Sequence, residues 1–193
     1  MKLNRSKIIS ISALLIATAI AVVFLLPKLS PMNNQEEHAS QDGVMGGSIA
    51  ISNDGSKVYS DNDYGFSFFY PENFSVGAFS DEEGTKTILV QNAEEGVGVQ
   101  IFISAFDEDI VLNADRIKKE LPDIAMSDVK NIVLGGLASK YDVQAVSFKT
   151  GTAGADESRE VWLVAKGNLY QISIPIQSEK LISDIITTWQ WGN

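Results

Sequence analysis

Clusters of acidic side chains are the groups in this sequence whose possible chemistry is easiest to name. The densest is Asp107-Glu108-Asp109, which follows a long apolar alternation. Carboxylate oxygens are the ligands that calcium prefers, and calcium takes six to eight oxygens. The Asp-x-Asp-x-Asp-Gly spacing of a calcium loop is missing, and neighbouring residues of a strand point to opposite faces. We interpret the cluster as solvated turn charge, keep it as a candidate binding site, and predict no metal site.

Paired carboxylates could instead hydrolyse a glycosidic bond. That mechanism needs two carboxyl groups about 5–5.5 Å or 6.5–9.5 Å apart in a cleft. The acids of this chain fall mostly in turns, as in Asp81-Glu82-Glu83 and Glu94-Glu95. A small envelope hydrolase is therefore the alternative function, behind a non-catalytic one.

Nucleophilic catalysis of the familiar kinds is excluded by composition. The chain has no cysteine and a single histidine, His38, which falls in a predicted linker. The folded part therefore cannot build a Ser-His-Asp or Cys-His site, and it lacks the ligands that zinc prefers. A Ser-Lys dyad stays open, although no pair stands out. We predict no catalytic residue and no cofactor.

Trp191 is the aromatic residue that we expect to be exposed, because it stands next to the carboxyl end. Tryptophan is often only partly buried, so a cap over the end of the core is an equally supported interpretation. We include Trp191 with Asp107, Glu108 and Asp109 as candidate binding residues.

Charge is distributed unevenly along the 193 residues, whose formal net charge is −10. Residues 1–28 carry four basic and no acidic side chains, and the rest carries 11 basic and 25 acidic ones. An acidic domain repels phosphate backbones, so we predict no nucleic-acid partner.

The amino end has the pattern of a membrane anchor. Residues 8–26 are uncharged and follow the basic residues Lys2, Arg5 and Lys7. As a helix this segment would span about 28 Å, close to the thickness of a bilayer core. The positive flank predicts a cytoplasmic amino terminus at 1–7 and an extracytoplasmic domain. A cleaved signal peptide is disfavoured, because no Ala-x-Ala site follows the apolar segment.

Two further features accompany the predicted anchor. Ala13, Ala17 and Ala21 share one helix face, which would allow weak self-association, although alanine is common in such segments. Residues 27–56 are rich in Asn, Gln, Ser and Gly, which predicts a flexible linker.

From Lys57 onward, short apolar alternations separated by turn residues predict strands. The expected strands are 66–70, 85–91, 97–106, 137–148, 159–166 and 169–174, with a further short one at 130–134. A hairpin turn is expected at Glu94-Glu95-Gly96 and another at Gly167-Asn168.

Two helices are expected beside these strands. Asn113 is a good N-cap for one, which ends at Pro122, and the other spans 178–189. The order of elements predicts an α+β fold, with an antiparallel sheet of six to seven strands covered by two helices.

The segment Tyr64-Gly65-Phe66-Ser67-Phe68-Phe69-Tyr70-Pro71-Glu72-Asn73-Phe74 resembles the opening motif of PsbP-like domains. Further matches are the strand-turn-strand at 162–172 and Ile185-Ile186-Thr187-Thr188-Trp189. The resemblance covers about residues 57–193 and implies the PsbP/Mog-type fold. A tryptophan is usual where Phe74 stands, and the membrane anchor differs from the plastid protein, so photosystem binding is not carried over.

These observations together predict a single-pass protein of a bacterial cell membrane. Its extracytoplasmic PsbP-like domain would act without catalysis, as a binding or accessory module that recruits a protein partner.

Overall fold

The computed structural model describes residues 47–51, 56–82, 84–136, 139–151 and 157–192, with only the backbone of 47–51. The predicted cytoplasmic end (1–7), the anchor (8–26) with its three alanines, and His38 lie outside these residues. Within the part of the chain that is described, no helix has both the length and the apolar character to cross a bilayer.

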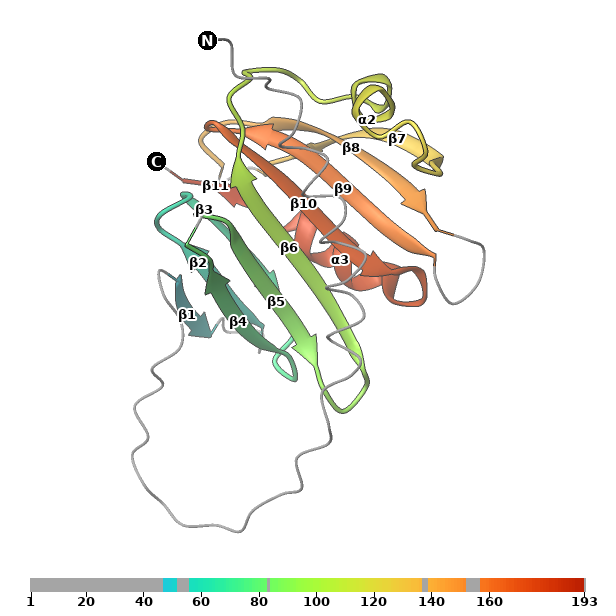
Figure 1. Cartoon of the computed structure of the whole chain (residues 1–193). Helices are drawn as coiled ribbons and strands as arrows, with labels where there is room; N and C mark the ends of the chain where they lie inside the picture. Colours follow the sequence, from blue (N-terminus) through green and yellow to red (C-terminus); the bar gives the residue numbers. More distant parts are fainter. Residues whose placement is uncertain (1–46, 52–55, 83, 137–138, 152–156, 193) are drawn as a thin grey trace, which may run out of the picture.

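A sheet of seven antiparallel strands forms the frame of the domain (Figure 1). Its spatial order is β4-β5-β6-β10-β9-β8-β7, so two meanders meet where β6 pairs with β10. This order leaves β4 and β7 at the two ends. The strands are β4 (Ser75–Ser80), β5 (Lys86–Asn92), β6 (Val97–Ala105), β7 (Ser127–Leu134), β8 (Val143–Thr150), β9 (Ser158–Ala165) and β10 (Asn168–Pro175).

A second sheet of four strands lies apart from the first, in the order β1-β2-β3-β11. Its strands are β1 (Gly47–Ile51), β2 (Lys57–Asp61), β3 (Phe66–Tyr70) and β11 (Gln190–Trp191). The alternation in β3 buries Phe66, Phe68 and Tyr70 and leaves the residues between them half-buried, which is the pattern of a strand with one face on a core.

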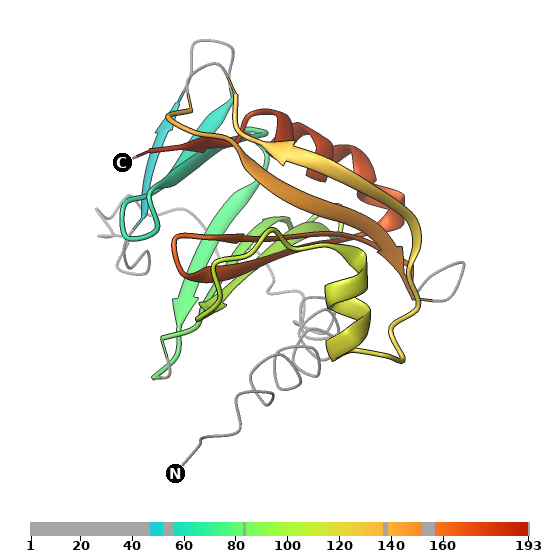
Figure 2. The same cartoon turned by 90° about the horizontal axis from the view of Figure 1, so that it is seen from above.

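The helices lie on opposite faces of the seven-stranded sheet (Figure 2). Helix α3 (Glu179–Thr187), entered through the 3-10 turn η1 (Ile176–Ser178), shares the main core with the four-stranded sheet. Helix α2 (Ala114–Glu120) packs through Ile117 on the other face. It begins where the Asn113 side chain accepts a hydrogen bond of 2.8 Å from the backbone N–H of Arg116.

Aromatic rings fill the space between the two sheets. Phe66 stacks on Trp189 with ring centres 4.5 Å apart, and Phe68 stacks on the same indole at 5.5 Å. Trp189 is fully buried, as is Tyr170 of β10. Aromatic burial of this size contributes strongly to stability, so the small sheet is an integral layer of the domain.

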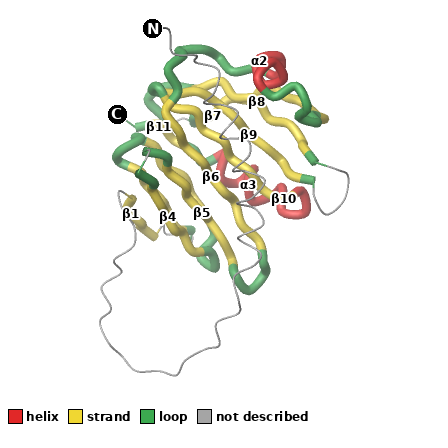
Figure 3. Tube along the Cα trace, in the orientation of Figure 1, coloured by secondary structure: helices red, strands yellow, loops and turns green. Residues whose placement is uncertain are grey.

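The expected α+β class is confirmed, with a large antiparallel sheet and two helices among the described residues (Figure 3). The strands at 66–70 and 97–106, the hairpin at Glu94-Glu95-Gly96 and the Asn113 cap are also confirmed.

Several expectations need correction. The sequence predicted one sheet, whereas β1, β2, β3 and β11 form a second one. Strand β1 falls within the segment 27–56 that was predicted to be a linker. The predicted linker therefore extends too far toward the carboxyl end. The last hairpin turns at Lys166-Gly167, one residue earlier than expected, because both residues adopt the positive φ that a tight primed turn needs.

Candidate functional site

The acidic residues Asp107, Glu108 and Asp109 lie in the exposed segment that leads from β6 to α2. Glu108 forms an ion pair of 2.8 Å with Arg116 of α2, whose guanidinium also binds Glu120. No group of three His, Cys, Asp or Glu residues in the described ranges could hold a metal ion. The contact of Glu108 fastens the connecting segment to the helix that follows it.

Trp191 is buried, with 1% of its surface exposed, so the expected exposure is wrong. Its indole N–H donates a hydrogen bond of 3.1 Å to the carbonyl of Leu134, and its ring stacks on Tyr141 at 5.8 Å. Trp191 is buried because the chain continues past α3 as strand β11, which pairs with β3 and accepts a hydrogen bond from Lys140.

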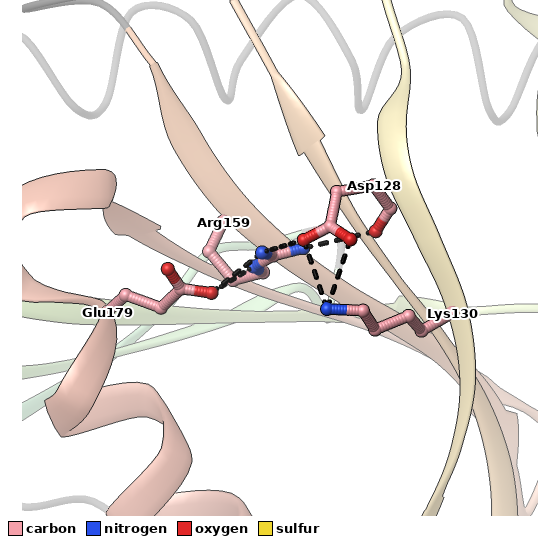
Figure 4. Close-up of polar contacts among 4 residues, drawn as sticks. All are labelled: Asp128, Lys130, Arg159 and Glu179. Atoms are coloured by element: carbon pink, nitrogen blue, oxygen red, sulfur yellow. Dashed lines mark hydrogen bonds and ion pairs between the residues drawn. The ribbon is translucent and has the colours of Figure 1, made fainter.

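A cluster of four charged side chains fixes one end of β7 (Figure 4). Arg159, on β9, has only 5% of its side chain exposed. Its Nε lies 2.7 Å from Glu179 at the start of α3, and its terminal nitrogen lies 2.6 Å from the Asp128 carboxylate. We call Asp128, Lys130, Arg159 and Glu179 the Arg159 clamp. It ties an inner strand, an edge strand and a helix together.

Asp128 has an unusual backbone conformation and a carboxylate that two cations of the clamp contact. The residue has φ 47, and the β7–β8 register shifts between Ser127 and Lys130, which marks a bulge. Hydrogen bonds from Arg159 and then from Lys130 lower the pKa of Asp128 to about 2. The backbone carbonyl of Asp128 also accepts a hydrogen bond from Arg159.

Beyond the bulge, β7 is regular and its outer edge has no neighbouring strand among the described residues. Ile132 and Leu134 pack against the main core, so Val133 points to the other face of the sheet. The exposed fractions are 51% for Val133 and 43% for Val129. An edge with exposed apolar side chains is a template for pairing with another chain. We call residues 130–134 the β7 edge.

A buried carboxyl group, Glu160, lies on the inner strand β9 and is 1% exposed. One oxygen accepts hydrogen bonds of 2.7 Å from both Ser158 and Ser173, and the other accepts one of 3.1 Å from the Trp162 indole. Burial raises the pKa of Glu160, and the three donors oppose that rise. Its hydrogen-bond partners are two hydroxyl groups and an indole. A glycosidase would instead need a second carboxyl group facing this one.

A buried ion pair joins the two sheets. Lys86 Nζ of β5 lies 2.6 Å from Asp61 Oδ2 of β2, and the side chains are 3% and 0% exposed. The Tyr59 hydroxyl donates to the same oxygen at 3.0 Å. Burial, and then the charge of Asp61, raises the pKa of Tyr59. All three groups are enclosed, so the pair fixes how the sheets meet and offers no surface to a ligand.

No model of a known protein family matches this chain, and no curated protein matches it. The structure is similar to the solution structure of cyanobacterial PsbP (CyanoP) from Synechocystis sp. PCC 6803, with a TM-score of 0.49 and 12% sequence identity. The similarity covers 80% of this chain and 98% of that chain.

Sequence reasoning missed the Arg159 clamp. It predicted the strand at 130–134, which forms part of β7, but not its place at the end of the sheet. Arg159 is separated from Asp128 by 31 residues and from Glu179 by 20. Only the strand order brings these residues together, and no local spacing indicates it. A usable signal was present in Asn131-Ile132-Val133-Leu134, where consecutive aliphatic residues mark a strand whose second face also carries apolar side chains.

Proposed function

We propose that this protein is a membrane-anchored, non-catalytic accessory module that binds a protein partner on the extracytoplasmic side. The observation that carries the proposal is the β7 edge, where the exposed Val133 stands on an end strand whose outer side has no partner strand in the described ranges. Strand edges of this kind are where other chains add to a sheet.

The membrane location of the module is supported by the sequence. Residues 8–26 are long and apolar enough to span a bilayer, and the basic residues stand on their amino side. Residues 27–46 would then separate β1 from the membrane by about 25 Å on average, if they behave as a flexible coil. That distance allows the domain to reach a partner in the same membrane or in the adjacent envelope layer.

The non-catalytic role is supported by the contacts of the two carboxyl groups whose pKa values are shifted, Glu160 and Asp128. The carboxyl oxygens of Glu160 are taken by three donors of the fold, and Asp128 is held by two cations. The alternative hydrolase would need two neighbouring carboxyl groups open to a substrate, and neither acid is placed in that way.

Site-specific cross-linking in cells tests the proposal. A photoreactive phenylalanine analogue replaces Val133 in the full-length protein, and a matched variant carries it in place of Phe79, which is 60% exposed on the opposite end strand β4. We expect position 133, and not position 79, to cross-link one reproducible envelope protein, identified by mass spectrometry of the linked peptides. Equal patterns from both positions, or none from 133, would overturn the proposal.

The anchor has its own test. We expect the full-length protein to stay in the membrane fraction after alkaline extraction, and the domain to be digested when protease is added to cells stripped of their wall. Release by alkali, or protection of the domain from protease, would reject the proposed topology.

A further inference from the structure

Glu160 lies among buried side chains on the face of the seven-stranded sheet that carries α2. In the register of the sheet, Glu160 stands opposite Phe148 of β8 and opposite Ser173 of β10. In the next row Trp162 stands opposite Gln171 of β10, and Gln171 is 2% exposed. The carboxyl group is therefore enclosed by side chains of its own strand and of both neighbouring strands.

Gln171 has a carboxamide without a partner beside this carboxyl group. Its Oε1 and Nε2 form no hydrogen bond within the part of the chain that the structure describes, although both are buried. Gln171 is the diagonal neighbour of Glu160, at a separation that long side chains bridge. A carboxamide accepts a hydrogen bond from a neutral carboxyl group and donates one to a carboxylate. Gln171 is therefore able to serve both protonation states of Glu160.

No cation compensates a charge on Glu160 among the described residues. On the three strands, Lys149, Arg159 and Tyr170 point to the opposite face of the sheet. The three hydrogen bonds to Glu160 come from neutral groups, and no charged group contributes to its raised pKa. The segments that pack on its face carry the titratable side chains Asp107, Glu108, Asp109, Asp115, Arg116, Lys118, Lys119, Glu120 and Asp123.

The cover over this part of the sheet is α2 with the segments on either side of it, residues 106–126, which we call the α2 layer. Phe148 and Trp162, the residues beside Glu160, pack in one cluster with Leu112 and Ile117 of this layer. Helix α2 has seven residues and is the only described α-helix on this face (Figure 2). A helix this short depends on its packing for stability, so the α2 layer responds to changes beneath it.

We propose that Glu160 is a proton switch for the α2 layer, which closes over the protonated carboxyl group and opens to water when the proton leaves for the solvent. An ionised carboxylate in the closed state would be a buried charge without a counter-ion, which is strongly unfavourable. Opening the layer hydrates that charge. The inference is independent of the proposed function, because it concerns the face of the sheet and needs no partner.

Hydrogen–deuterium exchange of the full-length protein in detergent micelles tests the switch between pH 4 and pH 8. Each rate is divided by the intrinsic exchange rate at the same pH, which leaves the opening equilibrium. We expect opening of residues 106–126 to increase above the ordinary glutamate pKa of about 4.5, by up to about tenfold per pH unit, and to level off beyond the raised pKa. Helix α3, on the other face, should change less.

A matched pair of variants assigns the effect to Glu160. Glu160→Gln cannot ionise, so the opening of residues 106–126 should stay constant across this pH range. Glu94→Gln makes the same change at an exposed turn position and should behave as the wild type.

A second measurement needs no change at position 160. The chain has three tryptophans, so selective ¹⁵N labelling gives three indole signals, and Trp162→Phe identifies the one that belongs to Trp162. Because this indole N–H donates to Glu160, its signal in the wild type should move with pH, with a midpoint above the ordinary glutamate range.

Three results would overturn the switch. The first is a Trp162 indole signal that stays constant from pH 4 to pH 8. The second is the same rise of opening in Glu160→Gln, or its loss in Glu94→Gln. The third is an equal rise in residues 106–126 and in α3, which would show that ionisation loosens the whole domain and not the α2 layer.

Discussion

Asp128 combines an unusual backbone conformation with a charge that two cations hold. Its low pKa of about 2 has a defined consequence for stability, because the folded protein binds its proton less tightly than the unfolded chain does. The stabilising contribution is complete above the ordinary pKa of about 3.8 and is lost as the pH falls toward about 2. Asparagine keeps the tolerance of a left-handed backbone and removes only the charge.

We therefore expect Asp128→Asn to lower the melting temperature near neutral pH, and the difference from the wild type to shrink between about pH 4 and pH 2. Thermal melts followed by circular dichroism across this range measure it. Asp184→Asn is the control, because it removes an exposed pair with Lys180 that contributes little. A difference that stays constant down to pH 2 would contradict the assigned role of Asp128.

Glu160 leads to the opposite pH dependence. Its pKa is raised by burial, so the folded state holds the proton more tightly, and the stability from this group falls as the pH rises through the raised pKa. Glu160→Gln cannot ionise. We expect the melting temperature of the variant, relative to the wild type, to increase as the pH rises above the ordinary glutamate pKa of about 4.5, and to level off once the raised pKa is passed. Parallel melting curves for the two proteins would show that Glu160 does not titrate as its burial implies.

At the scale of elements, the Lys86–Asp61 pair couples β5 to β2 through groups that are almost fully enclosed. Removing one partner leaves a buried charge without compensation, which typically costs about 3–5 kcal/mol. We expect Lys86→Met to lose stability of that size in urea unfolding. Adding Asp61→Asn should recover a large part, because the amide oxygen can still accept hydrogen bonds from the backbone of Asp63 and Tyr64. A double variant less stable than Lys86→Met alone would contradict this account.

The elements also show what the sequence could reveal. Strands β3 and β6 were predicted because apolar residues alternate along both segments, although β6 proves to be buried on both faces. Strand β4 was missed because Gly77 and the serines at both ends weaken its pattern, and β11 because it is two residues long. The Arg159 clamp was missed for a different reason. Its charged residues come from β7, β9 and α3, and only the order of strands in the sheet brings them within reach of one another.

At the scale of the whole molecule, Trp191 connects the end of the chain to both sheets. Its indole lies 5.5 Å from both Tyr170 and Trp189, and its N–H is bonded to the last residue of β7. We expect Trp191→Ala to destabilise the domain by about 3–5 kcal/mol, and Trp191→Phe to do so by less. Chemical unfolding measures both. A loss below about 1 kcal/mol for the alanine variant would indicate that Trp191 is a surface residue after all.

The proposed architecture is an anchor at residues 8–26, a tether, and a folded domain whose end strand β7 carries exposed valines and has no neighbouring strand on its outer edge among the described residues. The central claim is that this edge is occupied by a partner in the cell. Hydrogen exchange measured on native membranes containing the full-length protein, and on the same protein purified in detergent, tests it most directly. We predict slower exchange of residues 130–134 in the membranes, with no change in 75–80. Equal exchange of residues 130–134 in both samples would contradict the claim.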